Sequence, residues 1–297
     1  MKMSFCQCNH NRMYSARINR THPVAFIILI DQSGSMSEPT VFMQRKMSKA
    51  EAVALIVNRM IAELMFRCKR DDGYRSYFDI AVLGYHDDQV VSLWKEANRQ
   101  FVSSQDLADV ELPELRMEQE RRMPDGRTTV VSTLQKQWVK PYAAGKTPMF
   151  KALSACCELC KSWCAQEKHR ASYPPTIFNI TDGESSDGDD RQLLDMAEKI
   201  RMLSTDDGQA LLVNIHICSG EASDPVLFPQ SEEELPDQRY ARLLYRMSSE
   251  MPEVYEEEIA ALKGHSGKHF RGISYNAGMT DLIDMMNVGS VSVNFLF

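Results

Sequence analysis

Three short segments of this sequence carry oxygen-bearing side chains at spacings that could serve a metal ion. The first segment follows an apolar run and contains Asp31, Ser33 and Ser35 at intervals of two residues. The second segment, Gly-Lys-Thr-Pro-Met, contains Thr147, and the third, Thr-Asp-Gly, contains Asp182. Any one segment alone could be a simple turn or helix cap, because Asp, Ser and Thr favour both. The three together favour a shared site.

The chemistry of such a set is that of a hard cation. Carboxylates and hydroxyls form an oxygen-only ligand set, which suits Mg²⁺ or Mn²⁺ and disfavours zinc, whose usual ligands are nitrogen and sulfur. Mg²⁺ takes six oxygens at about 2.1 Å and usually keeps several waters. Five protein side chains, not all in direct contact, would leave room for water or for an incoming carboxylate.

The elements that must position these side chains can be predicted from hydrophobic patterning. Residues 23–31 are a continuous apolar run ending at Asp31, as expected of a parallel strand covered on both faces. Residues 174–183 form a second such run that contains Asp182. Pro148 suits a first helical position and Thr147 the cap before it. Because ligands bind at the carboxyl ends of parallel strands, the three segments are expected at one sheet edge.

Strand and helix patterns alternate along the rest of the chain. Helical spacing of apolar residues predicts helices over 46–70, 147–166, 190–203, parts of 237–263, and 279–287. Further strands are predicted over 77–86, 89–94, 209–220 and 268–275. This order predicts an α/β fold with a doubly wound, mostly parallel sheet flanked by helices.

One domain accounts for the chain better than two. No linker rich in Gly, Ser or Pro divides it, so we expect an N-terminal extension over 1–21, one domain over 22–288 and a tail over 289–297. Within the domain, 114–139 reads as two polar arms around a Pro-Asp-Gly turn, which predicts a solvent-facing β-hairpin insertion. This hairpin is a hypothetical partner surface.

Composition excludes several function classes. The chain has 297 residues, 43% of them hydrophobic and 25% charged, with a formal net charge of −7, so a nucleic-acid-binding surface is not expected. No apolar run approaches the roughly 20 residues that span a bilayer, and residues 1–23 lack the apolar core of a signal peptide. A cytoplasmic location without membrane association is therefore the expectation.

The eight cysteines and the histidines suggest weaker candidates. Cys156, Cys160 and Cys164 lie four residues apart on one helical stripe, for which packing is favoured over a metal or redox site. The cluster of Cys6, Cys8 and His10 could ligate a metal, but its position at a chain end favours a non-ligating role.

Three other polar residues are noted near the expected site. His86 lies after a strand, where a solvated loop is expected, and His216 lies within a strand, where a packed histidine is expected. Glu184 follows the third donor segment, at an edge where it could contact a partner.

The three donor segments together resemble those of the von Willebrand factor A (vWA) family. Asp-x-Ser-x-Ser, Thr in "GKTPM" and Asp in "TDG" are similar to the metal-ion-dependent adhesion site (MIDAS) of that family. The resemblance implies that Ser33, Ser35 and Thr147 are ligands, and that Asp31 and Asp182 bind directly or through water. All five positions are filled, in the family's order. Outside these segments the resemblance, over about 22–288, rests on element order.

The resemblance implies a function in binding rather than catalysis. The metal would accept a Glu or Asp side chain of another protein. The ending of "DQSGSM" is similar to the corresponding sequence in bacterial intracellular members of the family, which are linked to tellurium-resistance or stress operons, or to AAA+ ATPases. The chain is therefore expected to be an adaptor and not an enzyme. The alternatives are a metal-dependent phosphoryl hydrolase, an AAA+-associated chelatase-like subunit, and a metal-free scaffold. Against the hydrolase, Ser33 occupies the place where a phosphoaspartate enzyme would want a second Asp.

Overall fold

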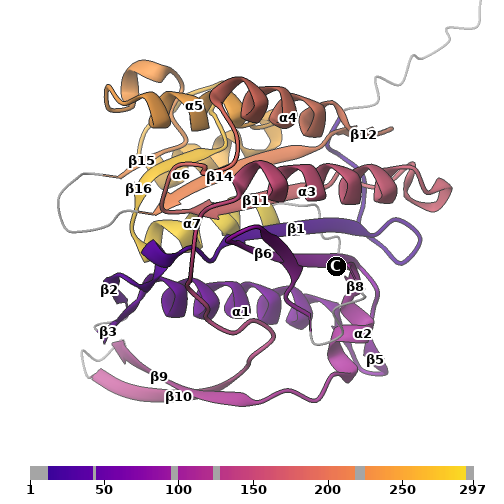
Figure 1. The fold of residues 1–297 in the computed structure, drawn as a ribbon. Coiled ribbons are helices and arrows are strands. Elements are labelled where there is room, and N and C mark those ends of the chain that lie inside the picture. Colours follow the sequence, from indigo (N-terminus) through magenta and orange to yellow (C-terminus); the bar gives the residue numbers. More distant parts are fainter. Residues whose placement is uncertain (1–12, 43–44, 95–99, 123–127, 218–224, 292–297) are drawn as a thin grey trace, which may run out of the picture.

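The computed structural model describes residues 13–42, 45–94, 100–122, 128–217 and 225–291 (Figure 1). Its centre is an 8-stranded sheet in the order β15-β16-β14-β11-β1-β6-β7, with β8 pairing with β6 beside β7. The five strands from β16 to β6 are parallel, and β15, β7 and β8 are antiparallel additions at the edges. The bounds are β1 (Val24–Asp31), β6 (Phe78–His86), β7 (Gln89–Ser92), β8 (Val102–Ser103), β11 (Thr176–Thr181), β14 (Leu211–Ile217), β15 (Val226–Leu227) and β16 (Ile273–Ala277).

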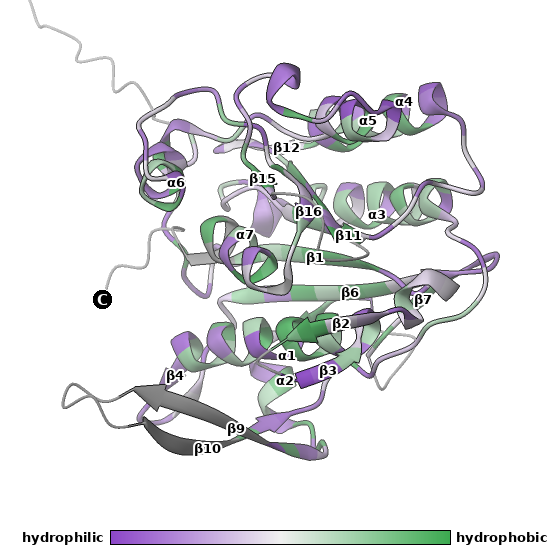
Figure 2. Cartoon of the chain, turned by 90° about the vertical axis from the view of Figure 1, so that its left-hand side faces the viewer, coloured by the Kyte–Doolittle hydropathy of each residue, from purple (hydrophilic) through white to green (hydrophobic). Residues whose placement is uncertain are grey.

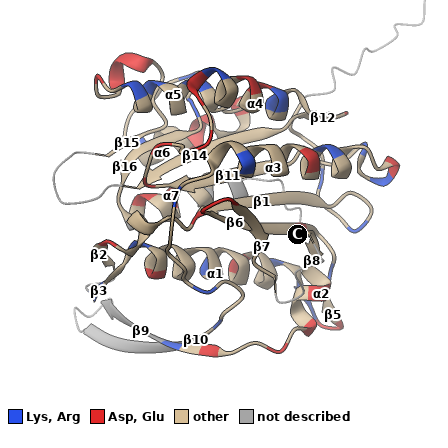
Figure 3. Cartoon of the chain, viewed as in Figure 1, with Lys and Arg blue, Asp and Glu red and all other residues tan. Residues whose placement is uncertain are grey.

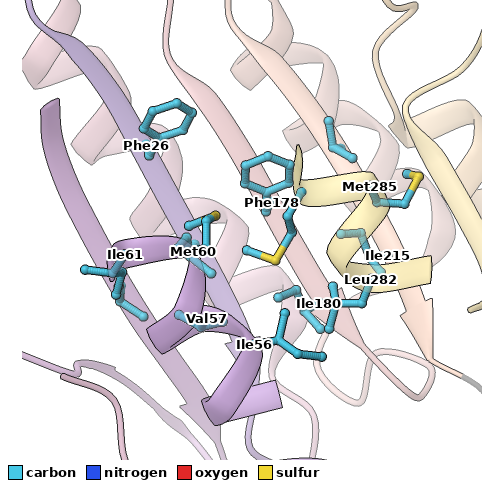
Figure 4. Packing of buried hydrophobic residues seen from close by; sticks show 14 of the residues in the cluster. Phe26, Ile56, Val57, Met60, Ile61, Phe178, Ile180, Ile215, Leu282 and Met285 are labelled. Atoms are coloured by element: carbon cyan, nitrogen blue, oxygen red, sulfur yellow. The ribbon is translucent and has the colours of Figure 1, made fainter. Parts of the chain in front are cut away.

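Helices cover both faces of this sheet (Figure 2). Alternate side chains of β1 point to opposite faces: Phe26 and Ile28 belong to one hydrophobic cluster, and Ile27 and Leu29 to the other. The first cluster packs against α1 and α7, as Figure 4 shows, and the second against α3, α4 and α5. The helices are α1 (Lys49–Cys68), α2 (Ser104–Asp109), α3 (Met149–Cys164), α4 (Asp190–Met202), α5 (Arg239–Met247), α6 (Glu256–Lys263) and α7 (Met279–Val291). The predicted doubly wound α/β fold is confirmed.

Burial on both faces explains the apolar strands. Every residue of β1 is buried, and so is every residue of β11 and β14. Each of these strands must therefore exclude charge until the chain leaves the sheet. Figure 3 accordingly shows Lys, Arg, Asp and Glu mainly on the helices and connecting loops, with the central strands largely uncharged.

The helix predicted over 46–70 begins three residues later than expected. Ser48 is the N-cap of α1: its hydroxyl accepts from the Glu51 backbone, and the Glu51 carboxylate accepts from the Ser48 backbone N–H. The residues before it form an antiparallel hairpin, β2 (Pro39–Phe42) with β3 (Arg45–Ser48), that the sequence did not predict. The capping box sets the helix start because it satisfies two backbone donors at this boundary.

The last strand is also displaced from its predicted range. Residues 268–275 were expected to form it, whereas β16 covers Ile273–Ala277 and β14 binds it at Asn214, Ile215 and Ile217. The apolar residue Phe270 lies within the predicted range, but it is buried in the core cluster from a loop. An apolar residue that packs from a loop looks the same in the sequence as one in a buried strand.

The predicted insertion does form a hairpin. Its arms are β9 (Glu114–Arg122) and β10 (Thr128–Lys136), and the turn residues 123–127 lie outside the described residues. It lies beside α1 (Figure 1), where the side-chain amide of Gln135 donates to the Leu55 carbonyl at 3.0 Å. Further short antiparallel pairs join β4 (Lys69–Arg70) to β5 (Gly73–Tyr74) and β12 (Ser204–Thr205) to β13 (Gly208–Gln209).

The described cysteines of the helical stripe are free thiols. Cys156 and Cys160 are buried in the hydrophobic cluster under α3, and Cys164 is half-buried. Burial raises the pKa of the Cys156 thiol, which keeps it neutral. Cys6, Cys8 and His10 lie outside the described residues. Within the described part of the chain, no helix combines the length and apolar character needed to cross a membrane.

Candidate functional site

The three donor segments meet where the sheet changes its direction of growth. From β1 the chain adds β6 on one side, and then returns to add β11 on the other side. The loop after β1 leads to α1 on one face, and the loop after β11 leads to α4 on the other. Such a switch point opens a crevice beyond the carboxyl ends of the two strands. Asp31 ends β1 and Asp182 directly follows β11, so both carboxylates lie at the edge of the sheet where such a crevice is expected.

Asp31 is fully buried and both of its carboxylate oxygens accept hydrogen bonds. Oδ1 accepts from the Ser33 backbone N–H at 2.9 Å, and Oδ2 accepts from the Thr181 hydroxyl at 2.8 Å. Burial raises the pKa of Asp31 to about 6, against the opposing effect of the bonds from Ser33 and Thr181; the nearby charge of Asp182 raises it further. A buried carboxylate of this kind gains stability when a cation approaches.

The two serines and Asp182 form a continuous chain of oxygens. The Ser33 and Ser35 hydroxyls are 3.1 Å apart, and the Ser35 hydroxyl donates to Asp182 Oδ1 at 2.6 Å. In octahedral Mg²⁺ coordination at about 2.1 Å, neighbouring ligands lie about 3.0 Å apart. The separation of the two serine hydroxyls matches this spacing, and that of Ser35 from Asp182 is shorter because a hydrogen bond joins them. In this structure, hydrogen bonds between the oxygens hold them together.

Backbone hydrogen bonds place the segment of Thr147 next to the loops that carry these oxygens. The Gly34 N–H donates to the Gly145 carbonyl at 3.0 Å, and the Ser186 N–H donates to the Thr147 carbonyl at 2.9 Å. The segment 145–147 therefore lies between the loops that carry Ser33 and Asp182. Gly145 has φ +71°, and a Cβ there would collide with the Asp87 carboxylate. The exposed Asp87 side chain could move aside, so it is the positive φ that favours glycine here.

The predicted helix start at Thr147 needs correction. α3 begins at Met149, Pro148 precedes it as N-cap, and no side chain of that residue caps the helix. The carboxylate of Asp187 does so instead, accepting from the backbone N–H of Phe150 at 2.9 Å and of Lys151 at 3.0 Å. Because Asp187 belongs to the loop after Asp182, this cap ties the third donor segment to α3.

Lys49 is a site residue that sequence reasoning missed. Its side chain is fully buried, and its ammonium donates to Asp182 Oδ2 at 2.8 Å and to Glu38 Oε2 at 2.7 Å. The predicted helix over 46–70 includes Lys49, but its pattern does not indicate that this lysine is buried, because the helix start and the partner carboxylates are set by the tertiary structure.

The other noted residues surround the site without joining the donors. His86 packs against Tyr142 at a ring-centroid distance of 4.6 Å with the two rings tilted by 43°, and Glu184 forms an ion pair with Arg239, which also binds Asp190. His216 is buried and stacks on Tyr275 at 4.3 Å, as expected of a packed histidine. Burial lowers the pKa of His216 to about 4, so it is neutral near pH 7.

The donor chemistry narrows the metals that would fit. Across the described part of the chain, no group of three or more His, Cys, Asp or Glu side chains is arranged to hold a metal. The candidate set instead combines two carboxylates with three hydroxyls. Oxygen-only donors of low total charge fit Mg²⁺ or Mn²⁺ better than zinc or copper.

Comparisons with known proteins concern the fold. No protein-family model matches the chain, and no curated protein matches it. Among solved structures, a von Willebrand factor type A protein from Catenulispora acidiphila is 13% identical, with a TM-score of 0.36 over 75% of this chain and 37% of that one. The vWF domain of the type V pili tip protein Mfa5 from Porphyromonas gingivalis is 13% identical, with a TM-score of 0.29 over 55% of this chain and 39% of that one.

The match to a third structure includes nearly the whole of that protein's chain. An uncharacterized membrane spanning protein from Vibrio fischeri is 12% identical, with a TM-score of 0.24 over 88% of this chain and 95% of that one. By contrast, this chain spans less than two fifths of the length of the Catenulispora and Porphyromonas structures.

Proposed function

We propose that this chain is a divalent-metal-dependent protein-interaction module. Asp31, Ser33, Ser35, Thr147 and Asp182 would hold Mg²⁺ or Mn²⁺, and an acidic side chain of another protein would take a remaining coordination position. One observation carries the proposal: the Ser33 hydroxyl, the Ser35 hydroxyl and the Asp182 carboxylate follow one another at 3.1 and 2.6 Å beside the buried Asp31.

The exposure of the donors supports an open side for a partner. Asp31 is inaccessible, and Ser33 and Asp182 are 2% and 8% exposed, whereas Ser35 is half-buried and is the more accessible of these donors. A ligand would therefore approach past Ser35. A carboxylate bound to a dication in a partly dry crevice can anchor an interface that is otherwise modest.

The residue two positions after Asp31 supports binding over phosphoryl hydrolysis. Ser33 stands where a phosphoaspartate hydrolase would place its second carboxylate. We therefore propose that the chain is not an enzyme, with a metal-dependent hydrolase as the competing function.

The partner belongs to the proposal as well. The motif resemblance favours a protein of an intracellular bacterial multiprotein system, such as an AAA+ ATPase or another product of a stress or tellurium-resistance operon. The cytoplasmic location expected from the sequence is part of the same prediction.

Metal binding is tested by titrating the purified protein with Mg²⁺ and Mn²⁺ in a calorimeter and by following its thermal unfolding. Ser35→Ala removes one neutral donor and leaves all charges in place, so we expect it to weaken metal binding by about tenfold or more. Ser154→Ala is the matched control, because it also removes one hydroxyl and the Ser154 hydroxyl donates to the Phe150 carbonyl within α3, outside the donor set. Absence of metal binding by the wild type, or equal affinities for wild type and Ser35→Ala, would contradict the proposal.

The class of function is tested separately. We expect no Mg²⁺-dependent turnover of p-nitrophenyl phosphate, and a partner that is captured from the native cell with Mg²⁺ but not with EDTA or by Asp31→Ala. Turnover that Asp31→Ala abolishes would favour the hydrolase. Capture that is indifferent to both EDTA and Asp31→Ala would favour a metal-free scaffold.

A further inference from the structure

The least expected feature of the site is an internal cation. Lys49 and Asp182 both have fully buried side chains and are joined at 2.8 Å, whereas Glu38, the other carboxylate on the same ammonium, is 49% exposed. The Lys49 backbone is held too, because its N–H donates to the Glu38 carbonyl at 3.0 Å. Lys49 is therefore a fixed part of the crevice wall.

Stability is a weak reason for such a buried pair. Removing two charges from water costs about as much as their attraction returns, and apolar replacements of buried pairs are often neutral or stabilising. The position at the start of α1 adds a further cost, because the positive end of the helix dipole faces the ammonium. The pair is better explained by a role in the chemistry of Asp182.

We propose that Lys49 weakens the metal site until a partner's carboxylate joins it, so that metal and partner bind cooperatively. This inference rests on the proposed function. The ammonium, which Asp182 shares with Glu38, compensates the Asp182 charge through Oδ2, so Asp31 is the only carboxylate among the five donors without a cation beside it. Counted without Glu38, the buried group of Asp31, Asp182 and Lys49 has one net negative charge. A dication makes this group positive, and one further carboxylate restores neutrality.

The remaining charge on Glu38 does not change this balance much. Half of its side chain is in solvent, where water weakens its field beyond the contact with Lys49, whereas Asp31, Asp182 and Lys49 are buried, where the field of a charge is stronger. The partner's carboxylate would therefore bind to the most positive place in the crevice. Since linkage is reciprocal, the metal raises the affinity for the carboxylate by the same factor.

The test uses acetate as the carboxylate probe. Mg²⁺ and Mn²⁺ affinities are measured by calorimetry in acetate and in chloride at equal ionic strength, with free metal corrected for acetate binding. We expect acetate to tighten metal binding to the wild type by a factor in the range of about 5–150, which is typical of coupled sites. Wild-type affinities that are equal in acetate and chloride would overturn the inference without any substitution.

Two variants assign the coupling to Lys49. Lys49→Gln keeps an N–H donor for Asp182 but removes the charge, so it should bind metal more tightly in chloride and lose most of the acetate effect; Lys49→Met is the second variant should Lys49→Gln not fold. Lys151→Gln is the matched control: it removes one exposed lysine that pairs with Asp88, and it should behave like the wild type.

The outcomes separate this inference from the function it rests on. Metal binding by the wild type with no gain on removing the Lys49 charge overturns the inference and leaves the metal site intact. An effect of the same size in Lys151→Gln also overturns it, since general surface charge then explains the result. No metal binding by any variant, with or without acetate, refutes the proposed function itself.

Discussion

Replacing Asp31 by Asn should make the metal-free protein more stable and metal-insensitive at the same time. Burial raises the pKa of Asp31 from 3.8 to about 6. Near pH 7 the carboxylate is ionised, and its burial destabilises the folded state relative to the unfolded state. At 1.36 kcal/mol per unit of pKa, this shift corresponds to about 3 kcal/mol of destabilisation at neutral pH.

The substitution preserves the local hydrogen bonds. The Asn carbonyl can accept from the Ser33 N–H as Asp31 Oδ1 does. Its amide would face the Thr181 hydroxyl, which can accept that bond because its own hydrogen has a second acceptor, the Gly183 carbonyl at 3.0 Å. We therefore expect Asp31→Asn to raise the free energy of unfolding in EDTA at pH 7.5, by up to about 3 kcal/mol.

The pH dependence of this difference has a definite sign. Between about pH 4 and pH 6 the folded state of the wild type binds more protons than the unfolded state, so the stability contributed by Asp31 is full below pH 4 and is lost as pH rises to 6. The advantage of Asp31→Asn should consequently vanish below pH 4. Above pH 6, Mg²⁺ should stabilise the wild type and leave Asp31→Asn unchanged.

The measurement is urea unfolding in EDTA and in Mg²⁺ over pH 4–8, with Asp88→Asn as the control for loss of an exposed carboxylate. A metal-free Asp31→Asn protein that is less stable than the wild type at pH 7.5 would refute the reasoning on burial. A variant that Mg²⁺ still stabilises would refute the assignment of Asp31 to the metal.

Two further predictions concern residues around the donors. Burial lowers the pKa of His216 from 6.5 to about 4, so the stability that neutral His216 contributes is present above pH 6.5, and about 3 kcal/mol of it is lost as pH falls to 4. His216→Phe should remove this loss in urea unfolding, and a pH profile like that of the wild type would contradict the prediction. Asp187→Ala removes the cap of α3 and should cost about 1 kcal/mol in the free energy of unfolding. It should also weaken Mg²⁺ binding in calorimetry, because Asp187 ties the Asp182 loop to α3; a loss of stability with unchanged metal affinity would show that the loop is held otherwise.

Local patterning was enough to predict most of the fold. The apolar run before Asp31 has no polar residue between 23 and 30, which only a strand buried on both faces requires, and β1 is buried throughout. The same reasoning placed Asp31 and Asp182 at strand ends, and parallel pairing of β1 with β11 brings those ends together. The polar arms of the insertion likewise predicted the hairpin of β9 and β10.

Signals that depend on distant partners were missed. Phe270 falls in the predicted strand range because apolar character alone cannot separate a packed loop from a paired strand. Thr147 looked like a helix cap because Thr is a good cap, yet the cap is Asp187, a residue 37 positions from Phe150.

Taken by itself, the sequence determines which residues can supply oxygen donors and that they stand where buried strands end, since hydrophobic period and turn chemistry are local properties of the chain. Only the tertiary structure decides that a lysine shares Asp182 with those donors. The two residues are 133 positions apart, and their pairing depends on where the sheet places α1 against the loop after β11. Burial and long-range charge pairing are set by packing, which no local pattern specifies.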